Sequence, residues 1–224
     1  MSEITLNGGA AVLRAHVFLP LAGVWSADLD VDTDEDVAGA VTVEVDGAVA
    51  FRGTVVDGGV THGLWRGRIV GGAAGLRGTL PALAYLDATR ADVVRDALAE
   101  AGETLSATSD SLAAAVARFH RAEGAAARAI DATAAALGYG WRVLADGTVW
   151  LGAETWPDAP EADVTLVDAD PRERSYALGG DVLGIRPGQL LQVQDEASAV
   201  FVRCGAVRLE VEPGAFTATV WRAP

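Results

Sequence analysis

The residues best able to do chemistry are the carboxylates of DLDVDTDEDV, residues 28–37. Their spacing suggests a calcium loop, but an EF-hand needs glycine at its sixth position and glutamate at its twelfth. Counted from Asp28, those positions hold Thr33 and Gly39, so the motif fails. Alternation along a strand explains the pattern better, with aspartates pointing outward and apolar residues inward. The inward set is Ala27, Leu29 and Val31.

A glycine-rich stretch, GGAAGLRG at residues 71–78, superficially resembles a phosphate-binding loop. It lacks the GxGxxG spacing and also the GK[ST] ending of a P-loop. It follows a β run but opens no amphipathic helix. We therefore expect a flexible loop between strands at this position.

The remaining candidates for catalysis are scattered. His16 alternates with apolar strand positions, His62 lies in a glycine-flanked turn, and His120 lies in a predicted helix, so no spacing offers a metal pair. No GxSxG nucleophile elbow occurs. Glycosidase chemistry needs two carboxylates, and the sequence selects no pair among its 31 acidic residues. We expect no enzyme, no catalytic residue, no cofactor and no metal.

The composition narrows the choice of partners. The chain of 224 residues is half hydrophobic, and it shows neither an apolar run near 18 residues nor a signal-peptide pattern. Its single cysteine, Cys204, excludes an intrachain disulfide framework. The net charge of −14 argues against binding to the phosphate backbone of a nucleic acid. The acidic residues could instead line a passage that repels DNA, or they could serve solubility alone.

Residues 1–86 have a β pattern throughout. Short runs rich in Val, Trp, Phe and Leu alternate with turn signals at roughly ten-residue spacing. One hairpin, VTVEVDGAVAF, has Asp46-Gly47 at its turn, where both residues would adopt positive φ. Strands without intervening helices predict an antiparallel barrel or sandwich.

From Thr89 onward, the spacing of apolar residues changes to the period of a helix. TRADVVRDALAEAG begins with a Thr89–Asp92 capping pattern and stops at Gly102. A second helical stretch is expected from about Asp110, breaking at Gly124 and resuming until Gly138. Its first half has an apolar ridge made of Leu112, Val116 and Phe119.

A short hairpin, LGYGWRVLADGTVWLG, follows at residues 137–152. Asp146-Gly147 predicts a two-residue loop that places Val143 opposite Trp150. One face then forms a structural core of Trp141, Val143 and Trp150. The other face carries Leu144, Val149 and Leu151. Because both faces are apolar, we expect a buried hairpin that packs against the helices and locks them to the barrel.

After a Pro/Asp-rich joint, β patterning returns over residues 159–224 and predicts a second small barrel. The expected fold class is α+β, mainly β, with two small antiparallel β-barrels of the kind found in tubes. The expected domains are a first barrel at 1–86, a helical insertion with a β-hairpin at 87–158, and a second barrel at 159–224.

The order and spacing of several motifs resemble a known family. GVWSADLDVD, GAVTVEVDGAVAFRGTV, RIVGG, FHRAEGAAARAI and LGYGWRVLADGTVWLG together are similar to baseplate hub proteins of phage tails. They are also similar to the hub portion of type VI secretion and contractile injection system spikes. The resemblance covers most of residues 20–156 and extends more loosely to the second barrel. The chain contains no lysozyme-like portion, so no peptidoglycan-cutting role is expected.

The resemblance implies a structural protein of the virion tail baseplate, assembled in the host cytoplasm. Two barrels per chain would form a homotrimer with pseudo-sixfold symmetry. This ring would join the hexameric tail tube above to the trimeric spike below, with other baseplate proteins around it and no membrane contact. DNA would pass along its axis without specific binding.

An axial channel for DNA would be lined by carboxylates, because an anionic wall lets DNA slide. The candidate channel-facing residues are Asp34, Glu35, Asp36, Glu44 and Asp57. Two other interpretations stay open. One is a tail-tube or distal-tail component that forms a hexameric ring. The other is an acidic β-rich hydrolase or carbohydrate-binding module.

Overall fold

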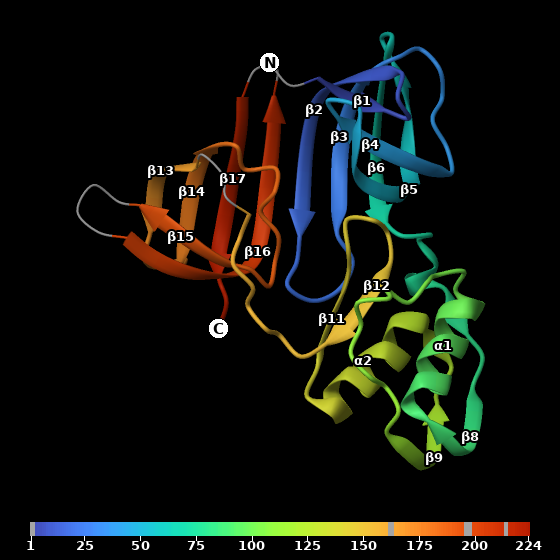
Figure 1. Cartoon of the computed structure of the whole chain (residues 1–224). Helices are drawn as coiled ribbons and strands as arrows, with labels where there is room; N and C mark the ends of the chain where they lie inside the picture. Colours follow the sequence, from blue (N-terminus) through green and yellow to red (C-terminus); the bar gives the residue numbers. More distant parts are fainter. Residues whose placement is uncertain (1–2, 161–163, 195–198, 213–214) are drawn as a thin grey trace.

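The computed structural model describes residues 3–160, 164–194, 199–212 and 215–224. The fold is mainly β, as predicted, with two α-helices in the described part. Figure 1 shows three regions: a barrel in blue to cyan, a green and yellow insert beside one end of it, and an orange to red sheet alongside the barrel.

Six strands form the first barrel. They are β1 (Ile4–Leu6), β2 (Ala10–Leu19), β3 (Ser26–Asp32), β4 (Ala40–Val45), β5 (Ala48–Thr61) and β6 (Leu64–Gly71). Their order is β1-β4-β5-β6-β3-β2, and pairing of β1 with β2 closes the ring. The predicted alternation in β3 is confirmed, since its apolar residues are buried and contribute to the core with Trp25 and Trp65.

The first predicted hairpin turn is also confirmed. Val45 pairs with Ala48, so Asp46 and Gly47 form a two-residue loop. Both adopt positive φ, 50° and 78°. Asp and Gly tolerate this conformation, and two such residues match the twist of the flanking strands.

The second unit consists of β13 (Val164–Asp170), β14 (Ser175–Gly180), β15 (Leu190–Gln194), β16 (Ala199–Glu212) and β17 (Ala215–Arg222). All its pairings are antiparallel, in the order β13-β14-β17-β16-β15. The unit curls so that β13 lies near β15, although the described residues contain no pairing between these two strands. Pairing of β2 with β16 joins it to the first barrel as one continuous sheet (Figure 1).

The second unit repeats the topology of the first barrel. In chain order β2, β3, β4, β5 and β6 correspond to β13, β14, β15, β16 and β17, because the neighbour relations are the same in both. The order β2-β3-β6-β5-β4 becomes β13-β14-β17-β16-β15. The fourth strand, β5 or β16, has 14 residues in both units, and the fifth, β6 or β17, has eight.

The insert lies between the two units in sequence. It contains a 3₁₀ turn (Gly75–Arg77), β7 (Thr79–Leu80), β8 (Leu83–Thr89), α1 (Arg90–Glu100), β9 (Ala115–Arg121), β10 (Gly124–Ala125) and α2 (Ala126–Leu137). The predicted cap of α1 is confirmed, with Thr89 and Asp92 forming a reciprocal capping box. The end of α2 at Gly138 is confirmed by its φ of 69°.

The predicted helix between Asp110 and Gly124 is wrong. Residues 115–121 form β9, which pairs with β8 through contacts such as Ala88 with Val116 and Tyr85 with Phe119. The i, i+4, i+7 ridge had indicated a helix, but β8 offers an unpaired edge at this place. Tertiary pairing outweighs a weak local preference. His120 therefore lies on a strand, exposed, and not on a helix.

The hairpin made by β11 (Gly140–Val143) and β12 (Val149–Gly152) exists, but its predicted register is wrong. Val143 pairs with Val149, and Trp150 pairs with Arg142. The Leu144 N–H donates to the Thr148 carbonyl at 2.8 Å, so the loop has three residues. Only Gly147 among these adopts positive φ, 83°, as in three-residue hairpin loops. The shift by one residue moves Trp150 to the opposite face.

Candidate functional site: barrel junction and assembly surfaces

The hairpin is tied to the first barrel by hydrogen bonds around its loop. The indole Nε1 of Trp25, in the barrel core, donates to the Leu144 carbonyl at 3.0 Å. The Arg52 N–H on β5 donates to the Ala145 carbonyl at 2.7 Å. At the other end, Gly23 and β11 exchange backbone hydrogen bonds. The hairpin therefore continues the hydrogen bonding of the barrel end.

The same hairpin contacts the insert through its buried face. Trp141 and Val143 are buried, as predicted, and belong to the main hydrophobic core. Trp141 Nε1 donates to Asp131 Oδ1 on α2 at 2.7 Å. The Val149 N–H donates to the Thr104 carbonyl at 2.8 Å. These contacts attach α2 and the segment after α1 to the barrel.

Trp150 lies outside that core. It is half-buried on the opposite face, where the Arg142 guanidinium lies 4.3 Å from the centre of its ring. Its Nε1 donates to the Thr108 carbonyl at 3.2 Å. Arg142 in turn pairs with Glu154. The predicted core of three residues is thus corrected: Trp141 and Val143 share one face, and Trp150 stacks on an arginine on the other.

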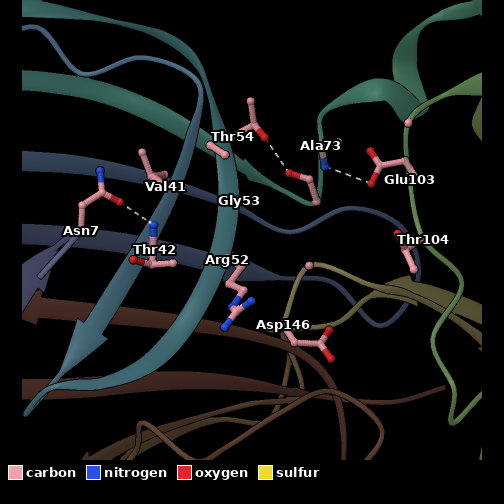
Figure 2. A pocket seen from close by; sticks show the side chains of 14 residues that line it. Asn7, Val41, Thr42, Arg52, Gly53, Thr54, Ala73, Glu103, Thr104 and Asp146 are labelled. Atoms are coloured by element: carbon pink, nitrogen blue, oxygen red, sulfur yellow. Dashed lines mark hydrogen bonds between the residues drawn. The ribbon is translucent and has the colours of Figure 1, made fainter.

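A cavity of about 390 Å³ lies between the first barrel, the glycine-rich loop and the hairpin tip. Figure 2 shows Arg52, Glu103 and Asp146 lining it from three different segments. Glu103 is buried, and its two oxygens accept hydrogen bonds from the backbone N–H groups of Ala73 and Gly75, both at 3.0 Å.

The glycine-rich loop therefore presents its N–H groups to a carboxylate of the same chain. Such N–H groups are what an anion-binding loop offers to a phosphate. Here Glu103 occupies them, which agrees with the rejection of a phosphate loop. The loop is also closely packed, since a Cβ on Gly75 would lie 1.7 Å from the Ala101 carbonyl oxygen. No sequence motif marks Glu103, because its partners lie about thirty residues away.

The carboxylates that line this cavity are engaged in hydrogen bonds within loops. The lining residues, all within the described ranges, include no histidine, cysteine or serine. Glu103 is held by backbone donors, and Asp146 Oδ1 accepts from the N–H and hydroxyl of Thr148 at 2.9 and 2.7 Å. Both carboxylates thus stabilise loops.

A second cavity, of about 450 Å³, lies where the first barrel, the hairpin and the second unit meet. Arg186, from the β14–β15 connection, lines it, and its guanidinium lies 4.9 Å from the ring of Phe51 in the first barrel. It donates to the carbonyls of Leu183 and Ile185. Burial lowers the pKa of Arg186 to about 10. Arg186 therefore links the two β units, and no sequence pattern marks it.

Two aspartates of β3, Asp28 and Asp30, form ion pairs across the barrel surface. Arg68 on β6 forms a two-pronged pair with Asp28 at 2.7 and 2.8 Å, and Arg66 lies 3.4 Å from Asp30. Hydrogen bonding to Arg68 holds the pKa of Asp28 below its ordinary value. Within the ranges that the structure describes, no group of three or more His, Cys, Asp or Glu could hold a metal ion.

The five candidate channel residues lie on three segments. Asp34, Glu35 and Asp36 are exposed in the β3–β4 loop. Glu44 on β4 is half-buried and accepts a hydrogen bond from the Thr42 hydroxyl at 3.2 Å. Asp57 is exposed on β5, beside the ion-paired arginines of β6. The loop residues form the one continuous acidic group among the five.

Large apolar side chains are exposed on the β units and on β8. Nine residues of this kind occur in the described part of the chain: Phe18, Val49, Val56, Val60, Leu83, Leu86, Val167, Val200 and Phe201. Three of them lie on β5 and one on β13. Exposed apolar groups beside free strand edges are typical of surfaces that other subunits cover.

The part of the chain that the structure describes contains no helix long and apolar enough to cross a membrane. No protein-family model matches the sequence, and no curated protein matches it.

Several solved structures share the fold over nearly the whole chain. The 43 kDa tail protein of prophage MuSo2 from Shewanella oneidensis matches with a TM-score of 0.72 and 12% identity, over 98% of this chain and 97% of that one. A tail protein from Neisseria meningitidis MC58 matches with a TM-score of 0.69 and 14% identity, over 99% and 96%.

A third match is the c3393 protein of E. coli, a component of the type VI secretion system with structural similarity to the T4 bacteriophage tail proteins gp27 and gp5. It has a TM-score of 0.69 and 11% identity, over 99% of this chain and 77% of that one. At such identities the comparison establishes the fold. The chain has the fold of phage tail proteins and of a tail-like component of a type VI secretion system.

Proposed function

We propose that this chain is the structural hub of a phage tail baseplate or of a phage-tail-like injection machine. Three copies form a ring that joins a hexameric tail tube to a trimeric spike and surrounds an axial channel. Other baseplate proteins contact its periphery, and it belongs to the virion tail after assembly in the host cytoplasm. The proposal assigns it no catalytic step.

The observation that carries the proposal is the repeated topology of the two β units. A ring of three chains would present six units of the same topology, which is the arrangement needed to match six tube subunits above. The same ring keeps true threefold symmetry for a spike below. A chain with a single unit would need six copies for the same match. Closed rings of identical subunits are the usual form of such assemblies.

The charge of the chain supports passage of DNA along the axis of this ring. A net charge of −14 disfavours retention of a polyanion. Asp34, Glu35 and Asp36 form a continuous exposed acidic loop that is suited to a channel wall. Glu44 and Asp57 are the weaker candidates, because one is half-buried and the other lies beside arginines.

Native mass spectrometry of the purified protein, over a range of concentrations, tests the proposal. The expected main assembly has three times the mass of the 23.0 kDa chain. Six copies would overturn the hub and favour a tail-tube or distal-tail ring. A chain that stays monomeric at every concentration would favour the hydrolase or carbohydrate-binding alternative instead.

A further inference from the structure

The contact between the two β units within one chain also indicates how copies join each other. In this intrachain joint, β2 of the first barrel pairs with β16 of the second unit, from Leu19 with Val207 to Ala15 with Val211. In the repeated series of five strands, β2 is the first strand of the first unit. The strand β16 is the fourth strand of the second unit. The joint is therefore head to tail: the first strand of one unit pairs with the fourth strand of the next.

The counterpart strands leave both halves of such a joint open. The first strand of the second unit is β13, which pairs with β14 on one side and has no strand partner on the other within the described residues. In the first barrel, with the repeat counted from β2, the fourth strand is β5. Its pairing with β4 ends at Thr54, and Val55 still donates to the Gly39 carbonyl, so residues 56–61 have no strand partner other than β6 in the described part of the chain.

Correspondence of individual residues follows from the pairings. Glu212 pairs with Ala215 at the end of the β16–β17 hairpin, and Thr61 pairs with Leu64 at the end of the β5–β6 hairpin. Counting back from these closing pairs, Val211 corresponds to Val60, and Glu210 corresponds to Gly59.

The same counting links β2 with β13. His16 is connected through Asp28 to Arg68 on β6. Asp168 is connected through Ala177 to Thr219 on β17. Arg68 and Thr219 lie at the same distance from their hairpin ends, so His16 corresponds to Asp168.

Side-chain burial agrees with an open joint. Val211 in the intrachain joint is 6% exposed, whereas its counterpart Val60, also a valine, is 39% exposed. Val56, near the other end of the β5 segment, is 47% exposed, and Val167 on β13 is 69% exposed. Apolar residues on a free strand edge are what a further strand would cover.

From these observations, and resting on the proposed hub function, we propose that β13 of one copy pairs antiparallel with residues 56–60 of β5 in the next copy. The partner is a second copy of this chain, and the pairing repeats the intrachain β2–β16 joint. Because the two surfaces differ, the contact is heterologous, and it closes into a ring when the rotation permits. Asp57 then lies in this joint and not in the channel wall.

Cysteine cross-linking tests the pairing in the full-length chain. By correspondence with Glu210 and His16, Gly59 of one copy should lie opposite Asp168 of the next. A Cβ at Gly59 meets no atom within 4 Å, and Asp168 is exposed, so both positions accept cysteine. The natural Cys204 is fully buried and does not interfere.

Equal amounts of G59C and D168C should form a disulfide-linked dimer on oxidation, whereas each variant alone should form none. The double variant should yield a covalent trimer on a non-reducing denaturing gel. A mixture of G59C with Leu86→Cys, on the exposed part of β8, is the control and should stay uncross-linked. Absence of the G59C–D168C product would overturn the proposed pairing.

A second variant tests the joint without cysteine. Val60→Glu places a charge in the joint and should weaken assembly at least about tenfold. Val49→Glu, on the same strand but beside β4 and 45% exposed, should leave assembly unchanged. Equal assembly of the two variants would contradict the joint.

The two proposals fail separately. A native trimer without the cross-link leaves the hub function standing and overturns the β13–β5 pairing. The cross-link in open polymers supports the pairing and contradicts a three-copy ring. A monomer without any cross-link overturns both.

Discussion

The carboxylate of Glu103 accepts a hydrogen bond from the backbone N–H of Gly75 at 3.0 Å, which ties the segment after α1 to the glycine-rich loop that follows β6. Its other oxygen accepts from Ala73, also at 3.0 Å. Figure 2 shows this carboxylate facing the glycine-rich loop from the segment that follows α1. One buried side chain thus holds two backbone N–H groups of this loop, which is also closely packed at Gly75.

Replacing Glu103 with alanine should destabilise the protein by about 1–3 kcal/mol, because two backbone donors of the glycine-rich loop lose their buried acceptor. Glu103→Gln should cost less, since its amide oxygen can still accept one hydrogen bond. Urea unfolding followed by circular dichroism measures both. Wild-type stability for Glu103→Ala would contradict the role assigned to this carboxylate.

The two hairpin tryptophans should respond differently to truncation. Trp141→Ala removes a buried ring and should cost about 3–5 kcal/mol of the free energy of unfolding. Trp150→Ala loses a stacked arginine and one hydrogen bond, and should cost about 2 kcal/mol or less. Chemical denaturation of the two variants gives the comparison. A larger loss for Trp150→Ala would show that the faces of the hairpin are assigned wrongly.

Cys204 should be inert towards thiol reagents in the folded protein. Its side chain is fully buried, and burial raises the pKa of the thiol from an ordinary 9.0 to about 12. The unfolded chain releases this proton first, so its contribution to stability is complete below pH 9 and decreases as the pH rises from 9 towards 12. Labelling with a chromogenic disulfide should therefore require unfolding at pH 8. Rapid labelling of native protein would contradict the burial.

Neutralising the acidic loop tests the assignment of the channel wall. A variant with Asp34→Asn, Glu35→Gln and Asp36→Asn should assemble normally, because these side chains are exposed and make no ion pair among the described residues. DNA release from tails that carry it should be slower, since a less anionic wall repels DNA less. The control neutralises a single carboxylate of the second unit, the exposed Glu173. Equal release rates for the two variants would contradict the assignment of this loop to the channel wall.

The features predicted correctly from the sequence are those set by neighbouring residues. The Asp46-Gly47 loop follows from the φ values that two residues tolerate, and the start of α1 follows from a capping box four residues long. Mainly β structure and its flanking helices were predictable from periodicity in the same way.

The features that the sequence did not predict depend on distant partners. Residues 115–121 form a strand because β8 lies beside them. Their own sequence pattern does not predict this pairing. The hairpin loop has three residues because Leu144 bonds to Thr148, although Asp146-Gly147 also suits a shorter loop. Glu103 and Arg186 acquire their roles only when segments far apart in the chain meet.

The repeat of the two units was predicted as a pair of barrels but not strand by strand. Val60 and Val211 are both valines, yet most other counterparts differ, as with Gly59 and Glu210. Topology preserves the neighbour relations while the side chains diverge, so the correspondence becomes visible only in the pairings.

The most direct test of the hub is the symmetry of this protein in assembled tails. Cryo-electron microscopy of purified particles, with this chain identified by a bound antibody fragment, would count the copies around the axis. We expect three copies that contribute six β units to one ring between the tube and the spike. Six copies, or a single copy away from the axis, would contradict it.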